Sequence, residues 1–152
     1  MTINEKPLHN VKSELLRQAH TLWEKKRAGR EMPSRADFDP LEMPHLLPQI
    51  LMMDVEHEGP RFRVRLAGTR IVEMYGSDYT GKYLDKIEFG DMAEKVLSDY
   101  KFALTERRPV FTDHMFRQAN DYRQRIERVI LPLSSDGETV NILFAVLDFE
   151  RI

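Results

Sequence analysis

The residues of this sequence best suited to chemistry are the adjacent pair Asp113-His114, which lies in a run of strand-forming residues. Neighbouring residues of a strand point to opposite faces of a sheet, so this pair cannot easily act on one substrate atom. Glu127 and Asp148 show no spacing typical of paired catalytic carboxylates, and we find no HExxH motif, nucleophile elbow or cluster of metal ligands. Catalysis is therefore not the leading interpretation.

Composition excludes several further classes of function. The chain has 152 residues and no cysteine, so it forms no disulfide, thiolate metal site or cysteinyl-flavin adduct. A formal net charge of −2 argues against a nucleic-acid-binding surface, which is usually strongly basic. No run approaches the ~18 apolar residues of a membrane span, and the first residues lack a secretion signal. We expect one cytoplasmic domain that binds neither nucleic acid nor membrane.

The first element that the sequence predicts is an amphipathic helix over residues 10–28. Apolar residues recur there every three or four positions: Val11, Leu15, Leu16, Ala19, Leu22 and Trp23. This periodicity is typical of a helix with one buried face. Asn10 is the expected cap, and Gly29 is expected to end the helix.

Five later segments have the pattern of β-strands, namely 49–56, 61–67, 110–116, 123–133 and 139–149. Between the second and third lie a short helix at 71–75 and a long helix that Asp91 caps and Pro109 closes. The order predicts an α+β domain with a five-stranded antiparallel sheet. The inserted helices should cover one face of the sheet and the N-terminal helix the other.

The segment 66–84 combines three glycines with a short helix signal. Gly68 should let the chain leave the sheet, Gly76 should end the helix with positive φ, and Gly81 should permit a turn. Their spacing matches neither a Walker motif nor a dinucleotide-binding motif. These glycines therefore predict a backbone path and not a phosphate site.

Four motifs in order resemble those of PAS domains. They are P-S-R-A-D-x-D-P at 33–40, L-P-x-I-L-x-x-D-V at 47–55, R-F-R-x-R-L-x-G-T at 61–69 and G-x-D-x-T-G-K-Y-L at 76–84. The chain is most similar to small stand-alone bacterial PAS proteins, over about residues 30–150. The resemblance implies a PAS-like sensor domain at 30–152 preceded by the helical segment 1–29, and a ligand cavity walled by residues 66–84.

Known PAS domains bind heme, flavins or small metabolites, or bind nothing, so the resemblance names no cofactor. The polar groups expected to converge on a bound molecule are Tyr75, Tyr100, His114 and Arg128. Heme-binding members commonly carry their histidine on the long helix, where this sequence has none, which leaves His114. Noncovalent flavin stays open. The same residues are also compatible with an ordinary filled core.

The resemblance implies a regulatory module for signal transduction without its own output domain. Such a module senses a small ligand, docks to signalling proteins, or does both. Homodimerisation through the N-terminal helix is expected, with Leu15, Leu22 and Trp23 as the apolar anchor; alternatively, this helix packs only on its own sheet. Two other classes stay open, a small isomerase or dehydratase with a cone-shaped α+β fold and a ligand-free structural adaptor.

Overall fold

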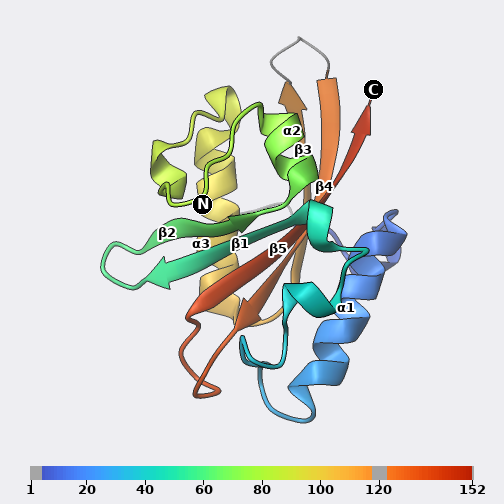
Figure 1. Ribbon diagram of the computed structural model, residues 1–152, viewed down its shortest axis with the longest axis vertical. Coiled ribbons are helices and arrows are strands. Elements are labelled where there is room, and N and C mark those ends of the chain that lie inside the picture. Colours follow the sequence, from blue (N-terminus) through green and yellow to red (C-terminus); the bar gives the residue numbers. More distant parts are fainter. Residues whose placement is uncertain (1–4, 118–122, 152) are drawn as a thin grey trace.

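The computed structural model describes residues 5–117 and 123–151. Within these residues, five strands form one antiparallel sheet in the order β2-β1-β5-β4-β3. The strands are β1 (Ile50–Glu56), β2 (Arg61–Ala67), β3 (Val110–Arg117), β4 (Arg123–Leu133) and β5 (Ile142–Arg151). Helices α1 (Glu14–Arg27) and α3 (Ala93–Glu106) lie on opposite faces, and α2 (Thr69–Tyr75) follows β2 (Figure 1). The predicted α+β fold is confirmed.

The β1–β2 hairpin follows the predicted alternation. Phe62 and Val64 are buried, whereas the arginines that alternate with them along the strand are exposed or half-buried. Arg65 donates to the Asp54 carboxylate on the neighbouring strand at 2.9 Å. The arginine face thus pairs with nearby acidic groups, as expected of a solvated sheet face.

The start of α1 differs from the prediction. Asn10 ends a separate 3-10 turn, and the helix begins after Ser13, whose hydroxyl accepts the backbone N–H of Leu16 at 3.2 Å. Serine is a favoured N-cap because its side chain satisfies one of the unpaired N–H groups of the first turn. Ala28 and Gly29, both with positive φ, follow the last turn.

The buried face of α1 is also shifted from the expected stripe. Leu16, Ala19 and Trp23 are at most 2% exposed, whereas Leu15 and Leu22 are half-buried at its flanks. The Trp23 indole packs on the sheet and donates its Nε1–H to the backbone carbonyl of Pro132 at 2.9 Å. Trp23 was expected to belong to the apolar dimer anchor, but its own domain already buries it, so it packs in the way that the alternative expectation described.

Helix α3 begins at Ala93, two residues after the predicted cap, because residues Gly90–Met92 form a 3-10 turn. Its buried face includes Val96, Tyr100 and Ala103, which follow one another at spacings of four and three residues. The same face also contains Asp99, which is completely buried. A carboxylate in this position needs partners, since burying an unpaired charge is costly.

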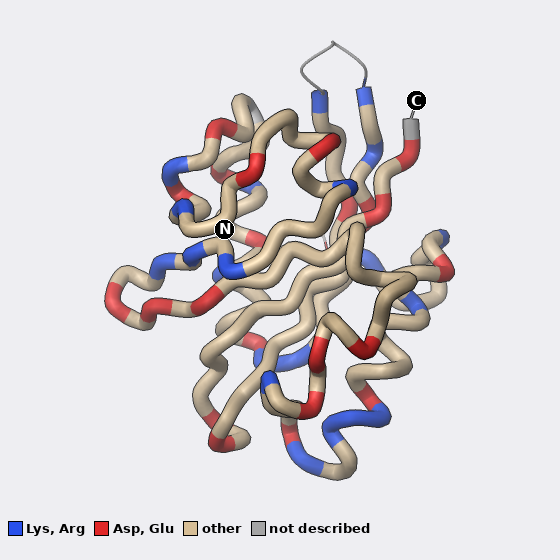
Figure 2. Tube along the Cα trace, in the orientation of Figure 1, with Lys and Arg blue, Asp and Glu red and all other residues tan. Residues whose placement is uncertain are grey.

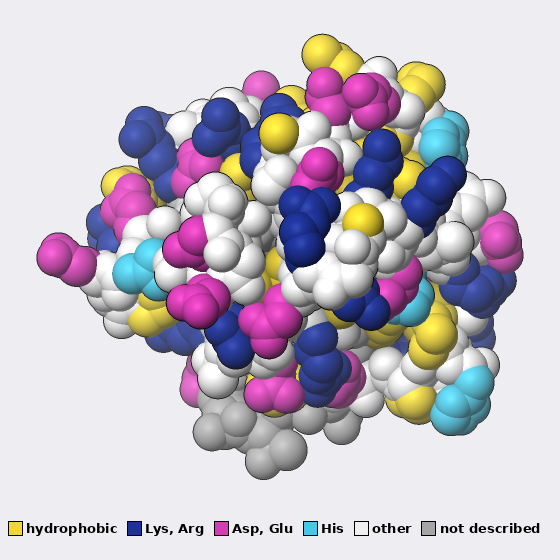
Figure 3. Space-filling view, turned by 90° about the horizontal axis from the view of Figure 1, so that it is seen from below, with side chains coloured by type: hydrophobic (Ala, Val, Ile, Leu, Met, Phe, Trp, Pro, Cys, Tyr) yellow, Lys and Arg dark blue, Asp and Glu magenta, His cyan; other side chains and the backbone are white. Residues whose placement is uncertain are grey.

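Acidic and basic residues are interspersed along the chain (Figure 2). The face seen from below carries both signs of charge with small hydrophobic areas between them, and it has no extended basic area (Figure 3). Among the described residues, no helix combines the length and the apolar character that a bilayer crossing requires.

Candidate functional site

Strand alternation gives the sheet two chemically different faces. Thr112 is paired with Arg128 across β3 and β4, and Asp113 is paired with Glu127. Residues paired in this way share a face, so the first pair points toward α3 and the second toward α1. We call the α3 side the inner face and the α1 side the outer face. As predicted, Asp113 and His114 lie on opposite faces.

The inner face carries a buried polar group that we call the inner cluster, consisting of Asp99, Tyr100, Thr112, His114 and Arg128. The Arg128 side chain is 1% exposed and donates from Nε and Nη2 to the Thr112 hydroxyl at 3.1 and 2.9 Å. Its Nη2 also donates to Asp99 Oδ2. The guanidinium lies over the Tyr100 ring, 4.7 Å from the centroid. The cluster therefore pairs and stacks a charge that would otherwise be costly to bury.

Two atoms of the inner cluster have no partner among the described residues. Asp99 Oδ2 receives a second hydrogen bond, from Lys95 Nζ at 2.7 Å, whereas Oδ1 is buried and unpaired. His114 Nδ1 is likewise buried and unpaired. Each such atom costs about 1–3 kcal/mol, so buried polar atoms are normally satisfied by protein, water or a ligand. The inner cluster thus offers unused hydrogen-bonding capacity inside the domain.

Burial in the inner cluster keeps the His114 ring and the Tyr100 hydroxyl group uncharged. Burial lowers the pKa of His114 to about 2, and the positive charges of Arg128 and Lys95 act in the same direction. Burial raises the pKa of Tyr100, although the Arg128 charge opposes it. At neutral pH, His114 therefore offers one ring N–H donor and one acceptor, and Tyr100 keeps its proton.

Tyr75, at the end of α2, lies at the rim of the inner cluster. It is half-buried, and its ring packs edge-on against Phe116 and Phe89 at 5.1 and 5.6 Å between centroids. Burial raises the pKa of Tyr75, and the charges of Tyr100 and Arg128 also act on it. The four residues proposed from the sequence therefore share the inner face, with Tyr75 the most peripheral.

Sequence reasoning missed Asp99, Thr112 and Lys95. Asp99 and Lys95 are four residues apart on α3, a spacing that commonly pairs opposite charges on a helix surface. Asp99 is also three residues after the buried Val96, so its place on the apolar stripe was a usable signal.

A large planar cofactor does not fit this arrangement. The Arg128 guanidinium and Tyr100 ring are both about 1% exposed and stack directly between α3 and the sheet. A porphyrin or an isoalloxazine ring would have to displace this pair and break the contact with Asp99.

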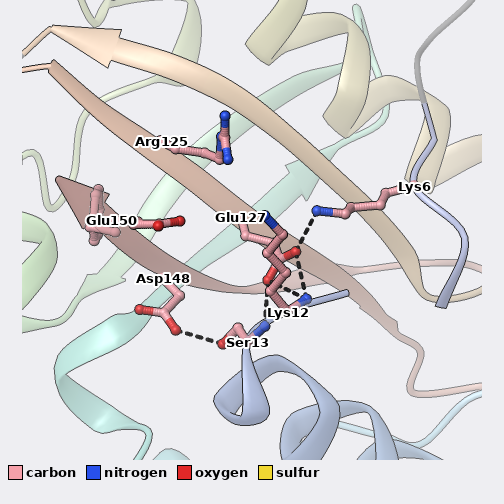
Figure 4. Close-up of a pocket in the computed structure, with 8 residues that line it drawn as sticks. Lys6, Lys12, Ser13, Arg125, Glu127, Asp148 and Glu150 are labelled. Atoms are coloured by element: carbon pink, nitrogen blue, oxygen red, sulfur yellow. Dashed lines mark hydrogen bonds and ion pairs between the residues drawn. The ribbon is translucent and has the colours of Figure 1, made fainter. Parts of the chain in front are cut away.

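A second polar group lies on the outer face, where the chain enters α1 (Figure 4). We call it the α1 latch; it joins Lys6, Lys12 and Ser13 to Asp113, Glu127 and Asp148. Glu127 accepts from Lys6 Nζ at 2.6 Å and from the backbone N–H groups of Ser13 and Lys12 at 2.6 and 2.9 Å. The Ser13 hydroxyl donates to Asp148 at 2.6 Å. A pocket of about 380 Å³ adjoins these residues.

The main charged groups of the α1 latch, Lys6 and Glu127, are paired. Burial alone would raise the pKa of Glu127, but the hydrogen bonds from Lys6, Lys12 and Ser13 lower it below the ordinary value. Lys6 also contacts Asp113 at 3.0 Å. Its pKa is raised because these two carboxylates outweigh the effect of burial. We therefore assign the latch to anchoring α1 on the sheet.

Comparison with solved structures finds the same fold in LOV and PAS proteins. The Rhodobacter sphaeroides LOV protein matches with a TM-score of 0.54 and 14% identity, over 91% of this chain and 68% of that one. Another RsLOV structure matches with a TM-score of 0.54 and 16% identity, over 74% of this chain and 66% of that one. The chain thus spans about two thirds of the length of these LOV proteins.

A PAS domain from Colwellia psychrerythraea matches with a TM-score of 0.52 and 10% identity, over 72% of this chain and 96% of that one. No curated protein matches the sequence significantly. A family model for the PAS domain matches residues 11–147. The motif order, the fold and this match agree, and the chain belongs to the PAS domain family.

Proposed function

We propose that this protein is a signal-sensing PAS module that binds a small polar molecule at the inner cluster, with Tyr75 at the rim. The observation that carries the proposal is the pair of buried, unpaired atoms, Asp99 Oδ1 and His114 Nδ1. A bound molecule that satisfies both atoms gains hydrogen bonds for which the protein has already lost hydration.

The free atoms restrict the chemistry of the ligand. Asp99 Oδ1 belongs to a carboxylate held by Arg128 and Lys95, so it requires a hydrogen-bond donor such as a hydroxyl or amide. In the neutral His114 ring, Nδ1 either accepts or donates a hydrogen bond, depending on the tautomer. We therefore expect a small molecule with at least one donor and with a compact polar end.

The same geometry argues against an acid–base enzyme. A general acid or base works best with a pKa near the operating pH, whereas that of His114 lies at about 2. Asp113, the nearest residue in sequence with a titratable carboxylate, lies on the opposite face and contacts Lys6.

The experiment that tests ligand binding is a paired native and denaturing mass spectrum of the purified protein, recorded with an absorption spectrum. A reproducible added mass in the native spectrum alone, without a heme or flavin band, supports the proposal. A native mass equal to that of the bare chain after brief, ligand-preserving purification favours the ligand-free adaptor.

We further propose that residues 1–29 relay the signal and that residues 30–152 sense it, in the cytoplasm. Within the α1 latch, Ser13 binds both Glu127 and Asp148. Glu127 is next to Arg128 in the chain and Asp148 is next to Leu147, and these two neighbours lie on the inner face. A ligand that moves Arg128 therefore acts on a strand that also holds α1. This sequence neighbourhood supports a path from ligand to helix.

Homodimerisation through α1 stays part of the proposal, with a different anchor. A groove of about 550 Å³ runs beside the helix and includes Leu22 and Leu46. Leu41 is 78% exposed in the turn Pro40–Glu42, only a few residues before Leu46. Sedimentation of Leu22→Asp and Leu41→Asp variants tests this surface: both should weaken a dimer, and an unchanged dimer places the interface elsewhere.

A further inference from the structure

We infer that two copies of this chain exchange Leu41, so that Leu41 of each copy fills the groove beside α1 of the other. This exchange rests on the homodimer proposed above, and it adds what each copy contributes to the interface. It also gives a role to the turn Pro40–Glu42, which ligand binding at the inner cluster does not use.

Leu41 stands on a well-anchored turn. The Asp39 carboxylate accepts the backbone N–H of Leu41 at 3.0 Å, and the N–H of Met43 donates to the Pro40 carbonyl at 3.1 Å. Pro40 and Met43 are buried, whereas Leu41 is 78% exposed. A turn that is already ordered costs little entropy when it binds, so this leucine is suited to anchor an interface.

The groove beside α1 offers space for such a side chain. It has a volume of about 550 Å³ and lies between α1, which contributes Leu22 and Lys25, and the segment before β1, which contributes His45 and Leu46. Figure 1 shows this segment, in cyan, alongside α1. Because Leu41 is exposed, it does not fill the groove of its own chain.

Two-fold symmetry makes the exchange reciprocal. Most homodimers have a two-fold axis, so both copies contribute the same surface to the interface. Leu41 precedes Leu46 by five residues, so at most about 18 Å of chain separates the exposed side chain from the groove. Leu41 of one copy that enters the other copy's groove leaves its own groove free for the second Leu41. The two contacts therefore form together.

The charges of the turn and of the groove are complementary. Leu41 lies between the acidic residues Asp39 and Glu42, and neither of them forms an ion pair within residues 5–117 and 123–151. Lys25 lines the groove and is exposed, and its side chain has no hydrogen bond or ion pair within the same ranges. Complementary charges of this kind fix the orientation of two surfaces.

The acidic residues of α1 near the groove do not neutralise Lys25, because each has a partner of its own. Glu14 pairs with Arg17 at 2.9 Å, and Glu24 pairs with Arg27 at 2.8 Å. The groove therefore keeps a positive charge for the acidic turn of a second copy.

Sedimentation equilibrium of two variants of the full chain and of their mixture tests the exchange. Leu41→Asp should weaken the dimer at least about tenfold because it removes both inserted side chains, and Leu22→Asp should do so because it places a charge in both grooves. An equal mixture should dimerise more strongly than either variant alone, since Leu41 of the second variant still enters the intact groove of the first. Leu8 is exposed and lies outside the groove, so Leu8→Asp is the matched control that should leave the dimer unchanged.

A second groove variant guards against misfolding. Leu22 is half-buried, whereas Thr21 is exposed and lines the same groove. Thr21→Glu therefore introduces a charge without disturbing the core. It should weaken the dimer, and mixing with Leu41→Asp should again recover part of the association.

Charge reversal tests the orientation of the two copies. Lys25→Glu and Glu42→Lys should each weaken the dimer about two- to tenfold, and the two changes combined in one chain should recover it, because the pair is restored with opposite signs. The effect of each single change should fall with added salt.

The outcomes separate the exchange from the homodimer itself. A wild-type chain that stays monomeric would remove both. A wild-type dimer that survives Leu41→Asp, or that Leu8→Asp weakens equally, would overturn the exchange alone. A mixture of Leu41→Asp and Leu22→Asp that associates no better than its components would also overturn it, because the two contacts would then not be reciprocal.

Discussion

Both faces of the sheet formed by strands β3, β4 and β5 carry buried charged residues, but the hydrogen bonds of these residues are satisfied to different degrees. On the outer face, Glu127 and Asp148 accept hydrogen bonds from the segment that enters α1. On the inner face, one residue along the chain from Glu127, Arg128 holds Asp99 while Asp99 Oδ1 stays unpaired. Buried charge marks both faces, but among the described residues of the inner cluster and the α1 latch, the buried atoms without a partner lie on the inner face. This contrast distinguishes a structural contact from a candidate binding site.

The largest expected effect comes from removing the inner cation. Arg128→Met leaves the Asp99 carboxylate buried with only Lys95 as a partner, so we expect a loss of about 3–5 kcal/mol in the free energy of unfolding. Urea denaturation measures this loss. Arg128→Met combined with Asp99→Leu should recover most of it, because no unpaired charge remains. A single variant as stable as the wild type would contradict the account of the cluster.

On the outer face, Glu127→Gln should cost about 1.5–3 kcal/mol, since it weakens hydrogen bonds from Lys6, Lys12 and Ser13 to a charged acceptor. The pKa of Glu127 is lower in the folded chain than its ordinary value of 4.5. Its stabilisation is therefore complete above pH 4.5 and is lost as the pH falls through the folded-state pKa.

Urea denaturation at several pH values tests this dependence. The difference in stability between wild type and Glu127→Gln should shrink as the pH is lowered below 4.5. A difference that stays constant down to acid denaturation would show that the charge of Glu127 does not hold α1.

A smaller effect is expected for Trp23→Phe, which keeps an aromatic ring but loses the hydrogen bond to the Pro132 carbonyl. We expect a loss of about 0.5–1.5 kcal/mol in thermal or urea unfolding. Because Trp23 is 2% exposed, the association state measured by sedimentation should not change. A dimer weakened by this variant, at preserved folding, would restore Trp23 as an interface residue.

The smallest effect on stability is expected at His114, because His114→Asn removes a ring whose Nδ1 has no partner. Ligand affinity should fall instead. In the wild type, affinity should not vary between about pH 5 and pH 8, since an imidazole with a pKa of about 2 stays neutral there. Calorimetry with a ligand identified by mass spectrometry measures both. An affinity that titrates near pH 6.5 would contradict the buried, neutral His114.

Local patterns were sufficient to predict most of the fold. Alternation placed Phe62 and Val64 in the core, and Gly76 ends α2 with a φ of 79° as its position suggested. Gly68 is required for a steric reason and not for a positive φ. Its own φ is −66°, and a Cβ there would lie 2.2 Å from the carbonyl oxygen of Leu47, so only glycine fits.

The errors arose where a residue's role depends on a distant partner. Ser13 starts α1 because its hydroxyl both caps the helix and contacts Asp148, which is 135 positions away. Asp99 was not singled out from the sequence, and its counter-charge, Arg128, lies 29 positions away. Local propensity contains neither pairing, so the sequence predicted the inner-face residues of the strands more completely than their partners.

Native mass spectra of wild type, His114→Phe and Glu127→Gln, recorded side by side, distinguish the inner face from the α1 latch as the ligand site. The inner face as ligand site predicts an added small-molecule mass on wild type and on Glu127→Gln that is missing from His114→Phe. An added mass that survives His114→Phe but disappears with Glu127→Gln would contradict the account, because it would place the ligand at the α1 latch.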